Sequence, residues 1–203
     1  RRGHMGKAID AAHPDSLADV DLVARAIAGS EDGFEALVRR YQRPIAAYIY
    51  RIVNDYDAAL DLTQEVFIKV YGSLARYRAE YKFSTWIYRI AHNVAIDHLR
   101  RAAARDEMAL KPRDERRERL AISMAPSPEQ EQERDERRTQ IEAIVDRLPT
   151  AYRELIVLRH GHDLSYEEIV EVTGLPLGTV KNRIFRAREM MRRMLIEQGI
   201  TGF

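Results

Sequence analysis

Between residues 77 and 89, aromatic and basic side chains alternate in a way that suits contact with nucleic acid. The segment reads YRAEYKFSTWIYR and holds five aromatic residues, including the only tryptophan of the chain, Trp86. Aromatic faces stack on unpaired bases, each contributing about 1 to 3 kcal/mol, while neighbouring cations neutralise phosphates. Duplex DNA exposes few such faces, so the segment predicts binding to single-stranded or locally opened nucleic acid. Aromatic clusters at helical spacing are more often core, and this alternative stays open, especially for Tyr88.

A second candidate site lies near the C-terminus, where DLSYEEIVEVTGLPLGTVKNRIF has the pattern of a helix-turn-helix. Ser165 and Glu168 form a capping box that starts the first short helix, and Gly174 can end that helix in a left-handed conformation. We expect the second helix to begin near Thr179, after a tight turn. Its buried positions then follow at steps of four, three and four residues: Val180, Ile184, Ala187 and Met191.

The outward face of this second helix carries the chemistry. Lys181, Asn182, Phe185 and Arg186 lie away from the buried positions, and residues 175–194 hold six basic side chains against one acidic. In the major groove, Lys and Arg reach guanine acceptors and Asn pairs with adenine, so the pattern predicts a recognition helix for duplex DNA. A solvated amphipathic helix in a bundle would also show a basic face.

Four histidines raise the question of a metal-dependent enzyme. His92 and His98 are six residues apart rather than three or four, and His160 and His162 adjoin a turn without a matched carboxylate. These spacings are not those of zinc ligands, and the chain has no cysteine to supply a thiolate. The sequence therefore predicts no catalytic residue, no metal site and no cofactor.

The elements that position both sites are predicted to be helices. Apolar residues recur at helical spacing in three stripes of the N-terminal half, and no segment alternates as a strand does. The stripes are Phe34, Leu37, Val38, Tyr41, Ile45, Tyr48, Ile49 and Ile52; Leu62, Val66, Phe67, Val70, Tyr71 and Leu74; and Ile87, Ile90, Ala91 and Val94. The predicted fold class is all-α.

A charged segment separates two small helical domains. From residue 102 to residue 140 the helical period fails, nine basic and ten acidic residues occur, and the sequence APSP interrupts any helix. We expect residues 1–18 to be a cloning remnant followed by an N-terminal tail, and residues 102–136 to be a flexible charged linker, partly helical at its ends. The linker joins an N-terminal helical domain, residues 19–101, to a C-terminal one, residues 137–198.

Composition excludes several classes of protein. The 33 basic and 32 acidic residues give a net charge of +1, so any affinity for nucleic acid must come from local segregation of charge. A chain without cysteines has no disulfides and no cysteine nucleophile, which fits a reducing cytosol. No apolar run approaches the roughly 18 residues of a membrane span, so we expect a cytoplasmic protein without membrane insertion.

Residues 61–101 and 148–189 closely resemble, in this order, bacterial RNA polymerase sigma factors of the extracytoplasmic-function type, in the sigma-70 family. The first range opens with DLTQEVFIKVY, and the second contains the helix-turn-helix. The resemblance implies that residues 19–101 are sigma region two, a helical bundle that docks on core polymerase and opens the minus-ten promoter element. It implies that residues 137–198 are region four, which reads the minus-thirty-five element, and that an anti-sigma factor controls the protein, as in stress responses.

The resemblance also assigns residues to three surfaces. The segment that contacts the clamp coiled coil of the largest polymerase subunit is matched by Asp61, Gln64, Glu65, Phe67 and Ile68, where Phe67 is either an interface anchor or core. The loop and helix start that capture a flipped minus-ten base and brace the melted strand are matched by Arg78, Glu80, Tyr81, Lys82, Phe83, Trp86, Arg89 and Asn93. Contacts to the minus-thirty-five element are matched by Tyr166, Glu167, Thr179, Lys181, Asn182, Arg183, Phe185 and Arg186.

Two details limit what the resemblance implies about specificity. Ala79, Glu80 and Tyr81 stand where many relatives have a small Gly-Asp or Gly-Glu pair, so no base preference is carried over to this loop. Lys181 and Asn182 stand where relatives vary most, so we expect these two side chains to select the minus-thirty-five sequence.

Two functions from different classes follow. In the first, the protein is not an enzyme but lends promoter specificity and strand opening to core RNA polymerase, binding duplex DNA with one domain and the melted strand with the other. The alternative is a helix-turn-helix activator that binds duplex DNA independently of polymerase. The aromatic segment and the sequence DLTQEVF argue against the alternative, because an activator needs neither.

Overall fold

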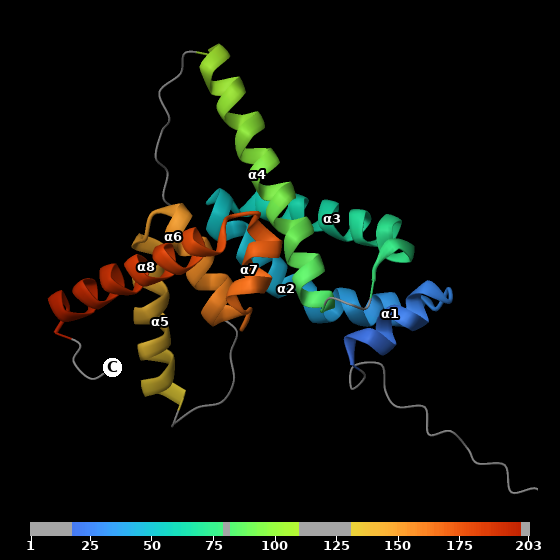
Figure 1. Ribbon diagram of the computed structural model, residues 1–203, viewed down its shortest axis with the longest axis horizontal. Helices are drawn as coiled ribbons and strands as arrows, with labels where there is room; N and C mark the ends of the chain where they lie inside the picture. Colours follow the sequence, from blue (N-terminus) through green and yellow to red (C-terminus); the bar gives the residue numbers. More distant parts are fainter. Residues whose placement is uncertain (1–17, 79–81, 110–130, 200–203) are drawn as a thin grey trace, which may run out of the picture.

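The computed structural model describes residues 18–78, 82–109 and 131–199. Within these ranges every regular element is helical, which confirms the all-α prediction (Figure 1). The elements are α1 (Asp19–Ile27), α2 (Glu31–Val53), α3 (Tyr56–Ser73), the 3-10 turn η2 (Leu74–Arg76), α4 (Phe83–Ala109), α5 (Glu131–Arg147), α6 (Thr150–Ile156), the π-helical turn η3 (Val157–Gly161), α7 (Tyr166–Thr173) and α8 (Leu177–Glu197). In the described residues no helix is both long and apolar enough to cross a bilayer.

Helix α2 is the central helix of the N-terminal bundle, with α1, α3 and α4 packed around it. The Ser30 side chain caps its start by accepting a hydrogen bond from the amide of Gly33 (3.3 Å), and Asn54 ends it in a left-handed conformation. The predicted stripe of α2 is buried from Leu37 to Ile52 apart from Val38, which is half-buried. Local capping and apolar spacing together therefore position this helix as predicted.

The stripe of α3 is correct except at Tyr71. Five of its predicted members are buried, whereas the Tyr71 side chain is 69% exposed and meets the ring of Phe34 edge-on, with the ring centroids 5.0 Å apart. Tyr71 directly follows the fully buried Val70, so the helix turns its side chain outward while an aromatic neighbour covers one edge. The prediction that Tyr71 is core was wrong.

The C-terminal half follows its local signals closely. Helix α6 begins directly after Pro149, and the capping box of Ser165 and Glu168 is formed in both directions at the start of α7. Gly174 ends α7 with φ +70°, as predicted. Helix α8 begins at Leu177, two residues earlier than expected. Pro176 directly precedes the helix in an extended conformation, and a proline at a helix start removes no hydrogen bond from the helix.

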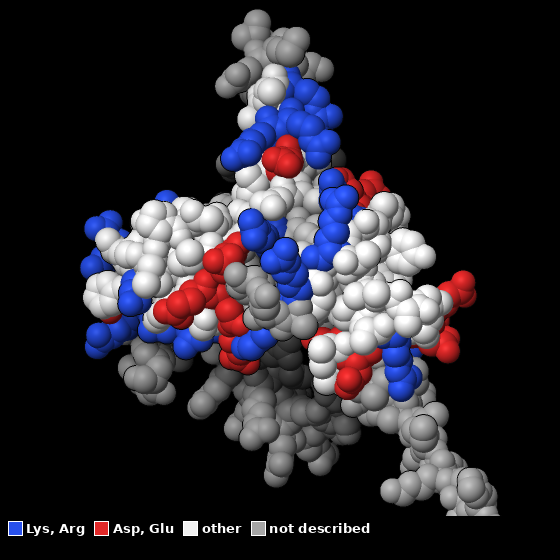
Figure 2. All heavy atoms as spheres, turned by 45° about the vertical axis from the view of Figure 1, so that its right-hand side comes forward, with Lys and Arg blue, Asp and Glu red and all other residues white. Residues whose placement is uncertain are grey.

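The two halves pack against each other, with α4 on α7 and α2 on α6. Their junction includes Arg153 of α6, whose guanidinium donates hydrogen bonds to the carbonyl oxygens of Arg51 (3.0 Å) and Leu148 (2.9 Å). Helix α4 extends well beyond this junction, and Figure 2 shows Lys and Arg side chains covering its projecting part, where Arg100, Arg101 and Arg105 are exposed. Both ends of the predicted linker are helical, since α4 runs to Ala109 and α5 begins at Glu131.

Candidate nucleic-acid interface

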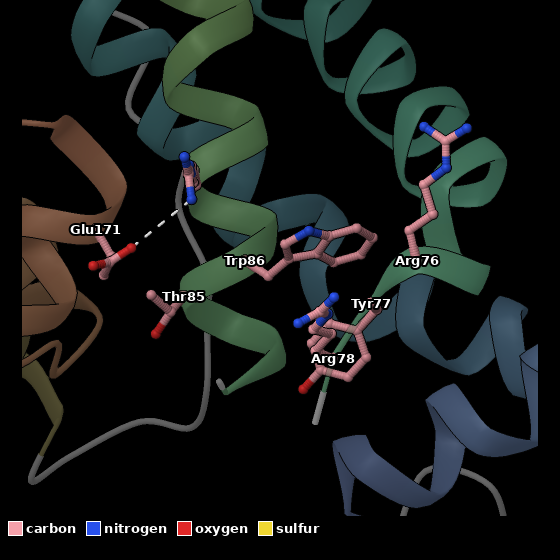
Figure 3. Close-up of a pocket in the computed structure, with 7 residues that line it drawn as sticks. Arg76, Tyr77, Arg78, Thr85, Trp86 and Glu171 are labelled. Carbon is pink, nitrogen blue, oxygen red and sulfur yellow. Dashed lines mark ion pairs between the residues drawn. The ribbon is translucent and has the colours of Figure 1, made fainter. Parts of the chain in front are cut away.

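A pocket of about 210 Å³ lies at the N-terminal end of α4 (Figure 3). Its walls come from the turn after α3, from the first two turns of α4 and from α7. The lining residues are Arg76, Tyr77, Arg78, Thr85, Trp86, Arg89 and Glu171. An aromatic surface beside three guanidinium groups suits an unpaired base and its adjoining phosphates.

Packed rings hold the Trp86 indole in place from one side. Its ring centroid lies 5.3 Å from that of Tyr77 and 5.7 Å from that of Phe83, and Phe83 in turn meets Tyr41 edge-on at 5.3 Å. Tyr41 hydrogen-bonds to Asp19 of α1, so the cluster is anchored to a second helix. The half-buried indole is therefore positioned in advance, which lowers the entropy cost of stacking a base on it.

Phe83 does not have the role that its sequence position suggests. It was predicted to belong to the base-reading loop, but it is the first residue of α4 and its side chain is only 2% exposed. The rings of Tyr41, Tyr77 and Trp86 surround it. Phe83 therefore supports Trp86 from the core and does not offer a face to a ligand.

The structure brings most other predicted minus-ten residues to one surface. Arg78, Lys82, Arg89 and Asn93 are exposed around the half-buried Trp86. The predicted contacts Glu80 and Tyr81 lie outside the described residues.

Four pocket residues are absent from the predicted set: Arg76, Tyr77, Thr85 and Glu171. Arg76 and Tyr77 come from the 3-10 turn η2 and its end, Thr85 from the first turn of α4, and Glu171 from α7. Arg76 and Arg78 both line the pocket. The alternation of aromatic and basic residues from Tyr77 onward was the available signal for Tyr77, whereas nothing in the local sequence indicated Thr85.

Helix α7 supplies acidic partners to this basic surface. Glu168 Oε1 lies 3.0 Å from Nζ of Lys82 and accepts a hydrogen bond from the Thr85 hydroxyl (3.2 Å). Glu171 Oε2 lies 3.8 Å from the Arg89 guanidinium, as the dashed line in Figure 3 marks. Partial burial opposes the ionisation of Glu168, but the hydrogen bond from the Ser165 amide and the contact with Lys82 outweigh it and hold its pKa below the usual value.

The predicted polymerase-binding segment lies along α3. Asp61, Gln64 and Ile68 are exposed, Ile68 with 72% of its surface, while Glu65 is half-buried and pairs with Lys69 at 3.4 Å. Phe67 is only 9% exposed and packs in the core of the bundle. Of the two alternatives for Phe67, the structure favours core, and the apolar side chain presented by this segment is Ile68.

The helix-turn-helix displays its predicted recognition face. Lys181, Asn182, Phe185 and Arg186 are exposed on α8, with Phe185 at 65%, whereas Thr179 and Arg183 are half-buried. On α7, Glu167 is exposed. Tyr166 is half-buried beneath the Arg159 guanidinium, which lies 5.3 Å from the ring centroid. The predicted contacts thus form one surface of two helices, with the charged and amide groups of α8 outermost.

Buried polar side chains join the two halves behind these surfaces. His162 Nδ1 lies 2.7 Å from the Tyr88 hydroxyl, with the two rings 4.3 Å apart. Nearby, His92 Nδ1 lies 2.8 Å from Oε1 of Glu154 and 3.3 Å from the Tyr48 hydroxyl. That Glu154 oxygen is buried and makes no hydrogen bond of good geometry among the described residues.

Three of the four histidines considered as metal ligands, His92, His160 and His162, have other partners. His160 receives a hydrogen bond from Arg188 (3.1 Å), and the burial of His162 lowers its pKa to about 4, with the nearby charge of Arg51 adding to the effect and that of Asp163 opposing it. His162 is therefore neutral, and we assign the Tyr88 hydroxyl as the donor to its Nδ1. Across the described part of the chain no three His, Cys, Asp or Glu side chains are grouped to hold a metal ion.

The packing of the two halves should weaken in acid because His162 must be neutral within it. The usual pKa of histidine is 6.5, so the unfolded chain takes up a proton that the folded chain excludes between pH 6.5 and about 4. Stability is complete above pH 6.5 and falls with decreasing pH, by about 2 kcal/mol at pH 5. Urea unfolding gives the free energy of unfolding of the native protein and of His162→Gln at pH 7 and pH 5. Because glutamine cannot titrate, the variant should lose less of this free energy between the two pH values than the native protein does. Equal losses in the two proteins would contradict it.

Comparison with known protein families gives two matches. The family described as Sigma-70 region 2 matches residues 37–105, and the family described as Sigma-70, region 4, matches residues 138–191. The first range contains Trp86 and the α3 segment, and the second contains the helix-turn-helix together with Glu171, the pocket residue of α7.

Individual proteins are similar over nearly the whole chain. The RNA polymerase sigma-H factor of Pseudomonas aeruginosa is 37% identical over 180 residues, which cover 87% of this chain and 93% of the relative. The ECF RNA polymerase sigma-E factor of Haemophilus influenzae is 35% identical over 184 residues, covering 89% and 97%. The solved structure of CnrH in complex with the cytosolic domain of CnrY has a TM-score of 0.60 and 25% identity, covering 89% of this chain and 99% of CnrH.

Proposed function

Because this chain belongs to the sigma-70 family of RNA polymerase sigma factors, and to its extracytoplasmic-function type, we propose how its parts divide the initiation of transcription. The protein directs core RNA polymerase to promoters. Residues 19–101 bind the polymerase through the outer face of α3 and open the minus-ten element at the Trp86 pocket. Residues 137–198 read the minus-thirty-five element through α8.

The Trp86 pocket is the observation that carries the strand-opening step. A duplex cannot present a base face to the indole, whereas an unpaired base can stack there while its phosphates meet Arg76, Arg78 and Arg89. Stacking contributes about 1 to 3 kcal/mol per base and offsets the cost of unpairing a few base pairs. Because the indole is already held by Tyr77 and Phe83, little ordering is required when the base arrives.

Duplex recognition is assigned to the exposed side chains of α8. Lys181 and Asn182 lie in the first turns of the helix, where a recognition helix contacts base edges. Lysine donates to guanine acceptors and asparagine pairs with adenine, so these two side chains carry sequence selectivity. Arg183 and Arg186 add phosphate contacts that set affinity without selecting sequence.

Start-site mapping tests this assignment together with the function as a whole. Purified protein is added to sigma-free core polymerase and genomic DNA, and transcript starts are mapped for the native protein and for Lys181→Ala/Asn182→Ala. We expect specific starts with the native protein and a changed set of minus-thirty-five sequences with the double variant, because each lost base contact changes discrimination by about 1 to 3 kcal/mol.

The matched control for this experiment is Arg192→Ala, an exposed basic residue further along α8 that should leave the set of starts unchanged. Polymerase binding should be equal in all three proteins. An unchanged set of starts with the double variant would refute the assignment of selectivity. Loss of polymerase binding by the double variant would show that Lys181 and Asn182 belong to the polymerase interface and not to the DNA interface.

The chemistry of transcription belongs to the polymerase, and we propose that this protein has no catalytic activity of its own. A protein that acts by binding polymerase and DNA needs exposed helix faces, such as those of α3 and α8, rather than an enclosed catalytic site. We further propose that it acts in the cytoplasm and that an anti-sigma partner controls it by covering the α3 and α4 surfaces. The similar protein CnrH is bound to the cytosolic domain of CnrY, which is consistent with such a partner. Family membership favours this function over an activator that works without polymerase.

A further inference from the structure

Two of the cations proposed to bind the melted strand are already engaged by acidic residues of the same chain. Lys82 and Arg89 pair with Glu168 and Glu171 of α7 at 3.0 and 3.8 Å. Thr85, a pocket residue, donates a hydrogen bond to Glu168. In Figure 3, Glu171 lies on one side of α4, next to Arg89, and the Trp86 indole lies on the other side. The minus-ten site of one domain is thus partly covered by a helix of the other.

The geometry of α7 suits this covering role. Glu168 and Glu171 are three residues apart, which places both carboxylates on one face of the helix. They present two consecutive negative groups to α4, as successive phosphates of a bound strand would. A strand and α7 therefore compete for the same cations, and both cannot occupy them at once.

Buried contacts behind the ion pairs hold α7 in this position. Exposed ion pairs alone contribute little to association, because solvent and salt screen them. Here the Tyr88 hydroxyl meets His162 at 2.7 Å in a mostly buried contact, and Arg153 donates a hydrogen bond to the carbonyl oxygen of Arg51 across the junction. Both halves belong to one chain, which raises their effective concentration for each other.

We propose that α7 closes the minus-ten site in the free protein, so that the melted strand binds only after the two halves separate. This inference rests on the proposed function of the Trp86 pocket. The exposed faces of α3 and α8 remain accessible in the closed form, with Ile68 72% exposed and Lys181 and Asn182 also exposed. Polymerase and duplex DNA can therefore engage the closed protein, whereas affinity for single strands is reduced by the fraction of closed molecules.

Replacing both glutamates by uncharged glutamines tests the closure. Glu168→Gln/Glu171→Gln removes both charges but keeps the capping box, because glutamine at the third helical position serves as well as glutamate. The probe is a fluorescent single strand carrying the minus-ten sequence of a promoter found by start-site mapping. We expect the double variant to bind it about tenfold more tightly than the native protein, following the rise in open molecules. The matched control Glu31→Gln/Glu197→Gln changes the charge equally at exposed sites and should bind like the native protein.

A distance measurement separates opening from a simple charge effect on DNA binding. The chain has no cysteines, so Ala103→Cys on α4 and Gln198→Cys after α8 accept spin labels uniquely. Without DNA, the native protein should show one narrow distribution of label-to-label distances, and the double variant should gain a second population. A native protein that already shows both populations, or tighter strand binding without any change in the distance distribution, would overturn the closure. Absence of specific starts in the mapping experiment would instead refute the proposed function.

Discussion

Replacing Trp86 by alanine is expected to reduce open-complex formation on duplex promoters by about fivefold or more. The indole is the larger of the two aromatic side chains that line the pocket, and loss of one stacked base costs about 1 to 3 kcal/mol. Phe83 cannot substitute for it because its ring is buried beneath. Permanganate reactivity of unpaired thymines measures the opening, with polymerase affinity measured in parallel.

Two controls make the Trp86 result specific. Trp86→Phe keeps an aromatic face against Tyr77 and should retain most of the activity. A promoter already unpaired at the minus-ten element should largely rescue Trp86→Ala if the defect lies in opening, since the unpairing cost has then been met by the template. Equal loss on paired and unpaired templates would place the role of Trp86 in folding or in polymerase binding.

Replacing Ile68 by aspartate is expected to weaken core polymerase binding by about 30-fold or more, because central apolar side chains of an interface contribute about 2 kcal/mol or more. The side chain is 72% exposed, so the free energy of unfolding should change by less than about 0.5 kcal/mol. Fluorescence anisotropy with labelled protein gives the affinity, and urea unfolding gives the stability.

The neighbouring position provides the contrast to Ile68. Phe67 is 9% exposed, and Phe67→Ala should lower the free energy of unfolding by about 3 to 5 kcal/mol. Ile196→Asp is the matched control, since Ile196 is 55% exposed but lies on α8, far along the chain from α3. If Ile196→Asp weakened polymerase binding as much as Ile68→Asp, the α3 assignment would be wrong.

Local signals in the sequence were sufficient for most of the fold. The capping box of Ser165 and Glu168, the left-handed Gly174 and the start of α6 after Pro149 each depend on residues within a few positions of one another. The apolar stripe of α2 was equally predictable, because a single helix that packs on several neighbours must bury one continuous face.

What the sequence could not indicate depends on residues far apart in the chain. Phe83 is buried because Tyr41, from a different helix, covers it, and no periodicity within α4 reveals that. The pairing of Lys82 with Glu168 joins positions 86 residues apart, since 168 minus 82 is 86. The resemblance to sigma factors placed both residues in or near nucleic-acid sites, but it gave no reason for them to meet.

Glu168 belongs to two contacts whose requirements differ. Its side chain accepts a hydrogen bond from the Ser165 amide at 2.7 Å, and it also pairs with Lys82. Starting α7 requires only a side-chain oxygen, which glutamine provides, whereas the pair requires a charge. Glu171 is an exposed residue with no part in the capping box. Over evolutionary time, drift at these two positions can therefore loosen or tighten closure while every descendant keeps the same helix-turn-helix, so sigma factors that fold alike can differ in how readily they release their own minus-ten site.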